Sequence, residues 1–197
     1  MAISFSPKYP ILTERLVLRP WRDDEVDRYH QLRGDPEVAR YLYDGPMTPQ
    51  LSSDKLRCLR SVVIDEGGWI NVAVEVADTG TVVGDVGLGW SGDIHRQAEI
   101  GYAFHRAHRG HGYATEAATA MVDLAFSGLG AHRVSGRLDA RNSASAQLLE
   151  RLGMRREAHL VQNEFVKGEW TDEAVYAVLA VEWRQRRSTR SAGPIHA

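Results

Sequence analysis

The stretch HRGHGYATEA, residues 108–117, decides the fold. It places two glycines, Gly110 and Gly112, directly before a run of residues that favours a helix. A helix N-terminus presents unpaired backbone N–H groups and a partial positive charge, so it attracts anions. Glycine lets the backbone take dihedral angles that other residues avoid, and it lets a ligand come close. A strand-like run at 98–104 precedes the loop, so strand, glycine loop and helix together predict a phosphate cradle.

The pattern on either side of the loop predicts a mixed sheet. Alternating apolar residues and turn signals indicate strands at 15–20, 69–76, 81–90, 98–104, 132–139, 154–166 and 172–183. Helical spacing and capping residues indicate helices at 23–35, 48–66, 112–127 and 143–153. The order β-α-α-β-β-β-α-β-α-β-β predicts an α+β fold (a mixed α/β sheet), mostly antiparallel, with helices on both faces.

The bulk composition is that of one globular domain. The chain has 197 residues, of which 43% are hydrophobic and 25% charged, and a formal net charge of -2. We expect a single domain over 1–183 and a flexible, arginine-rich tail over 184–197. The near-neutral charge disfavours nucleic acid as a partner, and neither a membrane span nor a signal peptide is indicated. With Cys58 as its one cysteine, the chain is expected to be cytoplasmic.

Three known phosphate cradles can be compared with the loop. The mononucleotide P-loop requires a Gly-Lys-Ser/Thr sequence, which the loop lacks. The dinucleotide fingerprint requires a third glycine where this chain has Thr115, and it lies in a βαβ unit, whereas this loop follows a meander. The third pattern, Arg/Gln-x-x-Gly-x-Gly/Ala, fits Arg109, Gly112 and Ala114.

Four blocks of the sequence, taken in order, resemble the GNAT superfamily of acetyltransferases, in which the third pattern cradles the pyrophosphate of coenzyme A. The blocks are LTERLVLRPW (12–21), AEIGYAFHRAHRGHGYATEA (98–117), NSASAQLLERLGMRRE (142–157) and WTDEAVYAVLAVEW (170–183). They are similar in particular to the branch of RimJ/RimL-like ribosomal-protein N-terminal acetyltransferases. The resemblance runs from about residue 12 to 183, and it implies a GNAT-like fold.

The resemblance also implies acetyl-CoA as the co-substrate. Backbone N–H groups of the glycine loop would hold the pyrophosphate with help from Arg109, and Asn142 would contact coenzyme A. The backbone of strand 98–104 would bind the pantetheine arm, and an N–H near Tyr102 or Ala103 would polarise the thioester carbonyl. The cofactor-binding residues expected in this way are Tyr102, Ala103, Arg109, Gly110, His111, Gly112, Tyr113, Ala114 and Asn142.

Two residues are candidates for moving protons. An amine is protonated at neutral pH and must lose a proton before it can attack. Glu99 lies on the small-residue face of its strand, near the acetyl group by resemblance, and is the expected base; alternatively it pairs with an arginine. By resemblance Ser145 lies near the sulfur and protonates the leaving thiolate, although serine is also common at helix N-termini. Leu149 stands where many members of the superfamily have a tyrosine acid.

No metal is expected. The spacing of His105, His108 and His111 could suggest a metal site. However, a strand end and a glycine loop would not bring three rings together, and no thiol or carboxylate joins them. Solvated or phosphate-facing histidines are the interpretation that we favour.

The resemblance implies direct acetyl transfer to a primary amine, without a covalent acyl-enzyme. A protein N-terminal α-amine is the expected acceptor. A small-molecule amine, such as an aminoglycoside, a polyamine or an amino-acid derivative, is the alternative, because one coenzyme A platform serves many acceptors. A non-catalytic coenzyme-A-binding module and a nucleotide-binding protein are further alternatives. The closing strands offer a surface for a homodimer. Aromatic residues that belong either to an acceptor pocket or to the core are Tyr41, Tyr43, Trp90 and Trp170.

Overall fold

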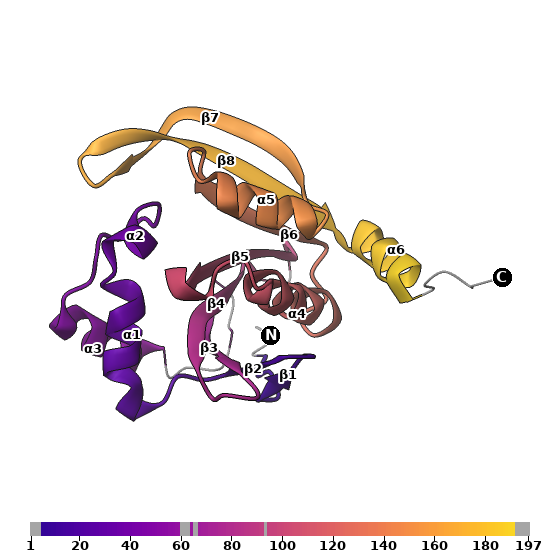
Figure 1. Ribbon diagram of the computed structural model, residues 1–197. Coiled ribbons are helices and arrows are strands. Elements are labelled where there is room, and N and C mark those ends of the chain that lie inside the picture. Colours follow the sequence, from indigo (N-terminus) through magenta and orange to yellow (C-terminus); the bar gives the residue numbers. More distant parts are fainter. Residues whose placement is uncertain (1–4, 60–63, 65–66, 93, 192–197) are drawn as a thin grey trace.

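One eight-stranded sheet organises the chain in the computed structural model, which describes residues 5–59, 64, 67–92 and 94–191 (Figure 1). The strands are β1 (Ile11–Leu12), β2 (Leu16–Arg19), β3 (Trp69–Val76), β4 (Val82–Trp90), β5 (Gln97–Phe104), β6 (Arg133–Asp139), β7 (Arg155–Val166) and β8 (Glu169–Leu179). Their order is β1-β2-β3-β4-β5-β6-β8-β7, and every neighbouring pair is antiparallel except β5 with β6. The predicted mixed, mostly antiparallel sheet is confirmed.

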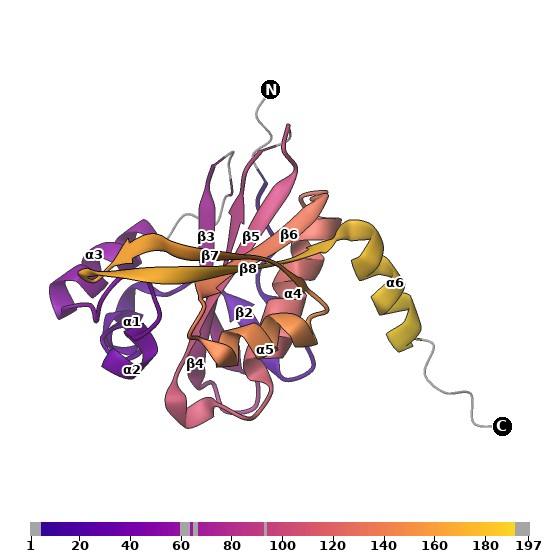
Figure 2. The same ribbon diagram turned by 90° about the horizontal axis from the view of Figure 1, so that it is seen from above.

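Helices cover both faces of the sheet, as predicted. They are α1 (Val26–Arg33), α2 (Pro36–Ala39), α3 (Pro49–Cys58), α4 (Tyr113–Ser127), α5 (Ser143–Arg151) and α6 (Ala180–Ser191), with short 3-10 turns η1 (Asp23–Glu25) and η2 (Arg106–His108). Helices α1 to α3 gather on one side of β3 and β4, and α4 and α5 lie on the other (Figures 1 and 2). No helix in the described part of the chain is both long enough and apolar enough to span a lipid bilayer.

Two hydrophobic cores result, one on each face of the sheet. Under α4 and α5 the larger core includes Ile100 of β5 and Met121 of α4. Under α1 and α3 the smaller core includes Tyr29, Leu56 and Ala103. Strand β5 therefore sends alternate side chains into different cores, as the two-residue period of a strand requires.

Helix α3 is shorter than the sequence predicts. It begins as expected, because the Thr48 hydroxyl accepts a hydrogen bond from the backbone N–H of Leu51 and a proline occupies the first turn. It ends at Cys58 rather than continuing to residue 66. Ile64 instead pairs with Phe5 in an isolated β-bridge and is fully buried. The remainder of the predicted extension, 60–63 and 65–66, lies outside the described residues.

The C-terminal segment also differs from the sequence expectation, because a helix replaces the end of the predicted strand. The predicted strand at 172–183 ends at Leu179, and α6 follows as far as Ser191, within the segment expected to be a flexible tail. Trp183 explains the change, because its side chain is buried and its indole N–H donates to Asp123 of α4 at 2.7 Å. This contact directs the first turns of α6 onto the body of the protein. Residues 192–197 lie outside the described part.

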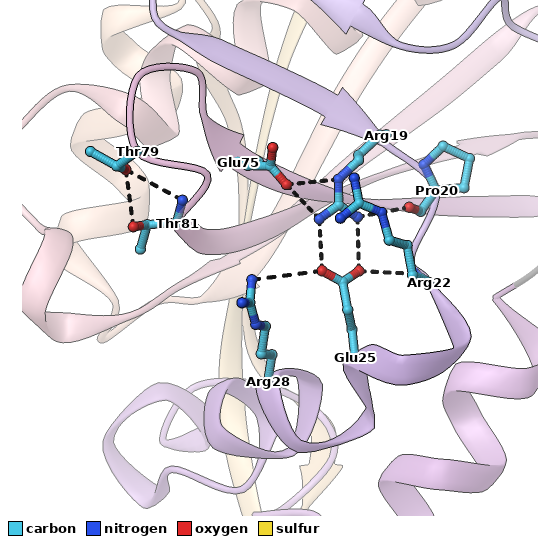
Figure 3. Close-up of polar contacts among 8 residues, drawn as sticks. All are labelled: Arg19, Pro20, Arg22, Glu25, Arg28, Glu75, Thr79 and Thr81. Carbon is cyan, nitrogen blue, oxygen red and sulfur yellow. Dashed lines mark hydrogen bonds and ion pairs between the residues drawn. The ribbon is translucent and has the colours of Figure 1, made fainter.

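A buried ion-pair network attaches the N-terminal helical layer to the sheet (Figure 3). Arg19 of β2 donates two hydrogen bonds to Glu25 of η1, at 2.8 and 2.7 Å, and two to Glu75 of β3, at 2.9 and 2.6 Å. The backbone N–H of Arg22 also donates to Glu25, at 2.9 Å. Burial alone would raise the pKa of Glu25, but the hydrogen bonds from Arg19 and Arg22 outweigh it, so the pKa of Glu25 is lowered.

Candidate active site

The sheet opens beside the middle of β5. Strand β5 pairs with β4 along its length, from Ala98 to Phe104, but with β6 only at 97–99. Within the described residues, the backbone of 100–104 therefore has no strand partner on its β6 side. Successive residues of a strand direct their N–H groups to opposite sides, so one of Tyr102 and Ala103 presents its N–H to this opening. Such an N–H is available for the role of thioester donor, which stays a prediction from the sequence.

The N-terminus of α5 borders this part of β5. The phenol of Tyr102 donates to the backbone carbonyl of Ser145 at 3.3 Å. Burial raises the pKa of Tyr102 to about 12, so the phenol remains a neutral donor at physiological pH. Asn142 caps α5, its Oδ1 accepting from the N–H of Ser145 at 3.1 Å. In the described part of the chain the Ser145 hydroxyl has no hydrogen-bond partner, so it is free to contact a ligand.

The glycine loop leads directly into α4. Gly110 and Gly112 have φ of 84° and 80°, in the left-handed region that favours glycine. No side chain caps α4, and among the described residues the backbone N–H groups from Gly110 to Thr115 have no hydrogen-bond partner. Arg109 is exposed and without an ion pair there. Unpaired donors at the positive end of a fifteen-residue helix, with a free guanidinium beside them, suit an anionic ligand.

Arg15 holds the glycine loop in place from the β1–β2 turn. Its guanidinium donates to the backbone carbonyl of His111 at 3.0 Å and forms an ion pair with Glu116 at 2.7 Å. The Glu116 carboxylate also accepts from the Thr13 hydroxyl at 2.6 Å. Burial opposes ionisation of Glu116, but the hydrogen bonds from Thr13 and Arg15 prevail and lower its pKa. The imidazole of His111 stacks on Tyr113, with 5.6 Å between ring centroids. The loop is thus fixed before any ligand arrives.

Glu99 faces the other side of the sheet, toward α1 and α3. It is half-buried, directly opposite Gly89 of β4 and Ser135 of β6. Burial raises the pKa of Glu99, the charge of Glu173 raises it further, and the charge of Arg137 opposes both. A carboxylate with a raised pKa next to the opening has the properties of a general base. Among the described residues, no arginine forms an ion pair with Glu99, which was the alternative reading of this residue, and Arg137 pairs with Glu173 instead.

A buried carboxylate organises the side chains around Glu99. Glu173 of β8 is 1% exposed and accepts two hydrogen bonds from Arg137 of β6, at 2.8 and 2.6 Å. It also accepts from the Tyr43 hydroxyl at 3.0 Å and from Asn163 at 2.9 Å. Sequence reasoning missed Arg137 and Glu173. Both residues lie in strands that carry further charged residues, so no local signal singled them out.

A pocket lies between the segment after α2 and the β7–β8 hairpin. Its lining residues are Arg40, Tyr41, Leu42, Tyr43, Asp139, Arg141, Glu164, Val166, Lys167, Glu169, Thr171, Asp172 and Glu173. The ammonium group of Lys167, at the tip of the hairpin, donates to the carbonyls of Ala39 and Arg40 at 2.5 and 3.1 Å. The hairpin is thereby tied to α2, and both views show it reaching over the N-terminal helices (Figures 1 and 2).

The four aromatic candidates separate into three positions. Tyr41 and Tyr43 line this pocket. Trp90 is 4% exposed and belongs to the core under α4. Trp170 is 60% exposed, packs against Phe165 and is not among the pocket residues.

The loop histidines do not form a cluster. The rings of His105 and His108 are 6.4 Å apart, while the ring of His111 stacks on Tyr113. Burial lowers the pKa of His105, with a further contribution from His108. Among the residues that the structure describes, no group of three His, Cys, Asp or Glu side chains is arranged to hold a metal ion.

Comparison with known proteins identifies the chain as an N-acetyltransferase. The acetyltransferase (GNAT) domain family matches residues 15–155. The uncharacterised N-acetyltransferase p20 of Bacillus licheniformis is 30% identical over 174 residues, covering 88% of this chain and 97% of that protein. The chain belongs to the GNAT acetyltransferase family, whose members use acetyl-CoA and act on amines.

Two further relatives match this chain over nearly the whole of their own length. The crystal structure of a GNAT-family acetyltransferase from Bacillus anthracis superposes with a TM-score of 0.79 at 26% identity, covering 87% of this chain and 99% of that one. The spermidine N(1)-acetyltransferase of Vibrio cholerae is 25% identical over 175 residues, covering 89% of this chain and 99% of that protein. The resemblance to the narrower RimJ/RimL-like branch stays a prediction.

Proposed function

We propose that this enzyme transfers the acetyl group of acetyl-CoA directly to a primary amine of a small molecule, with Glu99 as the base. The observation that carries the proposal is the opening of the sheet directly after Glu99. It leaves backbone donors of β5 unpaired on one edge of the strand, while the base faces the acceptor side of the same strand. The donor and the acceptor would meet there in the orientation that the reaction requires.

The residues present fit acetyl-CoA. Its pyrophosphate would lie on the unpaired N–H groups of the glycine loop at the start of α4, with Arg109 beside it. The pantetheine arm would follow the unpaired edge of 100–104, as a peptide-like chain adding to a strand. Asn142 uses its Oδ1 to cap α5, which leaves its amide N–H groups to contact the coenzyme.

In the proposed reaction, Glu99 and Ser145 each transfer a proton. Glu99 accepts one from the acceptor's ammonium group, which frees the nitrogen lone pair to attack the thioester carbon. The β5 N–H groups stabilise the negative charge that develops on the carbonyl oxygen. The C–S bond then breaks, Ser145 donates its hydroxyl proton to the departing thiolate, and it regains a proton from the newly acylated nitrogen. The products are the amide, coenzyme A and a protonated Glu99, which releases its proton to water.

Two observations favour a small amine over a protein N-terminus. Lys167 ties the β7–β8 hairpin to α2, which restricts the acceptor side for an extended polypeptide. Among the relatives, the one from Vibrio cholerae is named for a small polyamine substrate. The protein N-terminal α-amine expected from the sequence is the second candidate.

An acceptor panel tests the choice. We expect the wild-type enzyme to acetylate spermidine or other small primary amines with a kcat/KM at least about tenfold above that for a peptide with a free N-terminus, since tenfold corresponds to about 1.4 kcal/mol of transition-state binding. Coenzyme A release is the readout, with each amine omitted in turn as its control. Preference for the peptide would reverse the assignment, and turnover with none would favour a non-catalytic coenzyme-A-binding module.

Thermal unfolding tests the cradle. Acetyl-CoA at a hundred times its Kd should add about 2.7 kcal/mol, or roughly 5–10 °C for a domain of this size, whereas ATP and NAD should not. A valine at Gly112, where φ is 80°, should strain the loop by about 1–2 kcal/mol. The ligand-induced shift of Gly112→Val should then fall to about half at the same concentration.

Gly80→Val is the matched control, because Gly80 has φ of 66° in the β3–β4 turn, away from the cradle. It should lower the melting temperature without changing the acetyl-CoA shift. Equal loss of the shift in both variants, or a wild-type shift with ATP or NAD alone, would contradict the assignment.

A further inference from the structure

Trp69 lies flat on a surface made of glycine. It opens β3, and three glycines on β4 and β5 lie beneath its ring. A Cβ atom at Gly87 would come within 2.5 Å of its Nε1, one at Gly89 within 2.5 Å of its Cε3, and one at Gly101 within 3.1 Å of its Cζ2. These contacts run from the pyrrole side to the far edge of the indole, so one ring face rests on the sheet backbone. The side chain is nevertheless 45% exposed, so the other face is open.

The strand register places this ring next to Glu99. Trp69 is directly opposite Gly89, which in turn is directly opposite Glu99. Residues opposed in this way share one face of the sheet, with Cβ positions about 5 Å apart on adjacent strands. Since the benzene edge of the indole lies over Gly89, the ring and the Glu99 carboxylate border the same space.

Packing alone does not account for this arrangement. Glycine inside a strand weakens it and leaves nothing to pack, and an exposed indole forgoes part of the benefit of burial. Three glycines under one tryptophan produce a flat π-surface beside a carboxylate. A ring face attracts cations, and a carboxylate at its edge attracts the same ions. The nearby Arg137 is a poor competitor, because Nε and Nη2 of its guanidinium are bound to Glu173.

We propose that Trp69 binds the ammonium group of the acceptor by a cation–π interaction and delivers it to Glu99. The proposal rests on the proposed function, and it adds an acceptor-binding residue to that site. The cationic amine lies on the open ring face, and Glu99 at the ring edge removes its proton. Gly87, Gly89 and Gly101 are positioning residues, since they allow the indole to lie flat.

A binding experiment tests this site without turnover. Tetramethylammonium is the probe, because it is a permanent cation that cannot be acetylated, and tert-butanol is its neutral counterpart. We expect tetramethylammonium to produce a saturable change in tryptophan emission of the wild-type protein that tert-butanol does not produce. The change should be lost in Trp69→Leu and kept in Trp170→Leu, which alters another exposed tryptophan remote from Glu99. In Gly89→Ala, which keeps Trp69 but lifts its ring, the apparent Kd should rise at least threefold.

Kinetics supply the second readout, with spermidine and a free-N-terminal peptide as acceptors. For whichever is acetylated, Trp69→Leu should raise the amine KM about tenfold, with kcat within threefold and the acetyl-CoA KM unchanged. Trp69→Phe should be intermediate. An amine KM in Trp69→Leu equal to that of Trp170→Leu, or an emission change that persists in Trp69→Leu, would overturn the proposal while acetyl transfer stood. Saturable tetramethylammonium binding at Trp69 without turnover of either amine would support the site and reject the proposed function.

Discussion

Glu99→Gln is expected to lower kcat by about 100-fold or more at neutral pH, which is the typical contribution of a positioned general base. Glutamine has nearly the same shape but cannot accept the ammonium proton. The acetyl-CoA Kd should stay within about twofold, because Glu99 faces the acceptor side of β5. Calorimetric titration and steady-state kinetics measure the two quantities. Glu14→Gln is the matched control, since it makes the same charge change at an exposed position in the β1–β2 turn.

The pH dependence gives Glu99 a second signature. The base acts only when ionised, so kcat/KM rises with pH through the pKa of Glu99. Burial and the charge of Glu173 raise that pKa, while Arg137 opposes them, so this limb lies above the usual carboxylate range. Glu99→Gln should lose this limb and keep only the rise at higher pH from deprotonation of the free amine. A variant with an unchanged profile and rate would exclude Glu99 as the base.

Arg19→Met is expected to lower the free energy of unfolding by about 3–5 kcal/mol, because it leaves the carboxylates of Glu25 and Glu75 in the interior without a counter-charge. Denaturant unfolding at pH 7 measures the loss. Arg28→Met is the matched control. The Arg28 side chain is 55% exposed and forms a long ion pair with Glu25, at 3.9 Å, and such a pair contributes less than about 1 kcal/mol to stability. Similar losses in the two variants would mean that the network contributes little.

The sign of the pH effect follows from Glu25. The pKa of Glu25 is lower in the folded protein than in the unfolded chain. The Arg19–Glu25 ion pair therefore stabilises the protein fully at pH values above the unfolded pKa, and this stabilisation is lost as the pH falls through the folded pKa. Without Arg19, Glu25 loses the hydrogen bonds and the charge that contribute most to lowering its pKa. The difference between wild type and Arg19→Met should therefore be largest at neutral pH and narrow under acid conditions. A difference that widens toward low pH would contradict the assigned role.

Local signals predicted most of the fold. The meander of β3, β4 and β5, the glycine loop before α4 and the position of α5 all depend on residues close together in sequence. What the sequence did not predict depends on distant contacts. Helix α3 ends at Cys58, and Ile64 beyond it pairs with Phe5. The chain becomes helical after Leu179 because Trp183 docks on α4.

The same distinction between local signals and distant contacts applies to the candidate site. The glycine loop and Glu99 could be found in single segments of sequence. Arg137 and Glu173 meet only once β6 and β8 are paired in register, and neither residue carries a local motif. The ring of Trp69 reaches glycines on two other strands, and this depends on the alignment of three strands. A two-residue period indicates which face a side chain occupies, but not what crosses that face.

Because β5 sends alternate side chains to opposite faces, one short segment reaches both sides of the sheet. Ala103 packs under α1 and α3, whereas Ile100 and Tyr102 lie on the side of α4 and α5. Deleting a single residue within this segment would exchange the two faces and turn Glu99, the base that we propose, toward α4 and α5. Adding or removing two residues would preserve the faces but shift Glu99 along the strand. Under the proposed function, the parity of this strand keeps donor and acceptor on opposite faces, and we expect only length changes of two residues to preserve that arrangement.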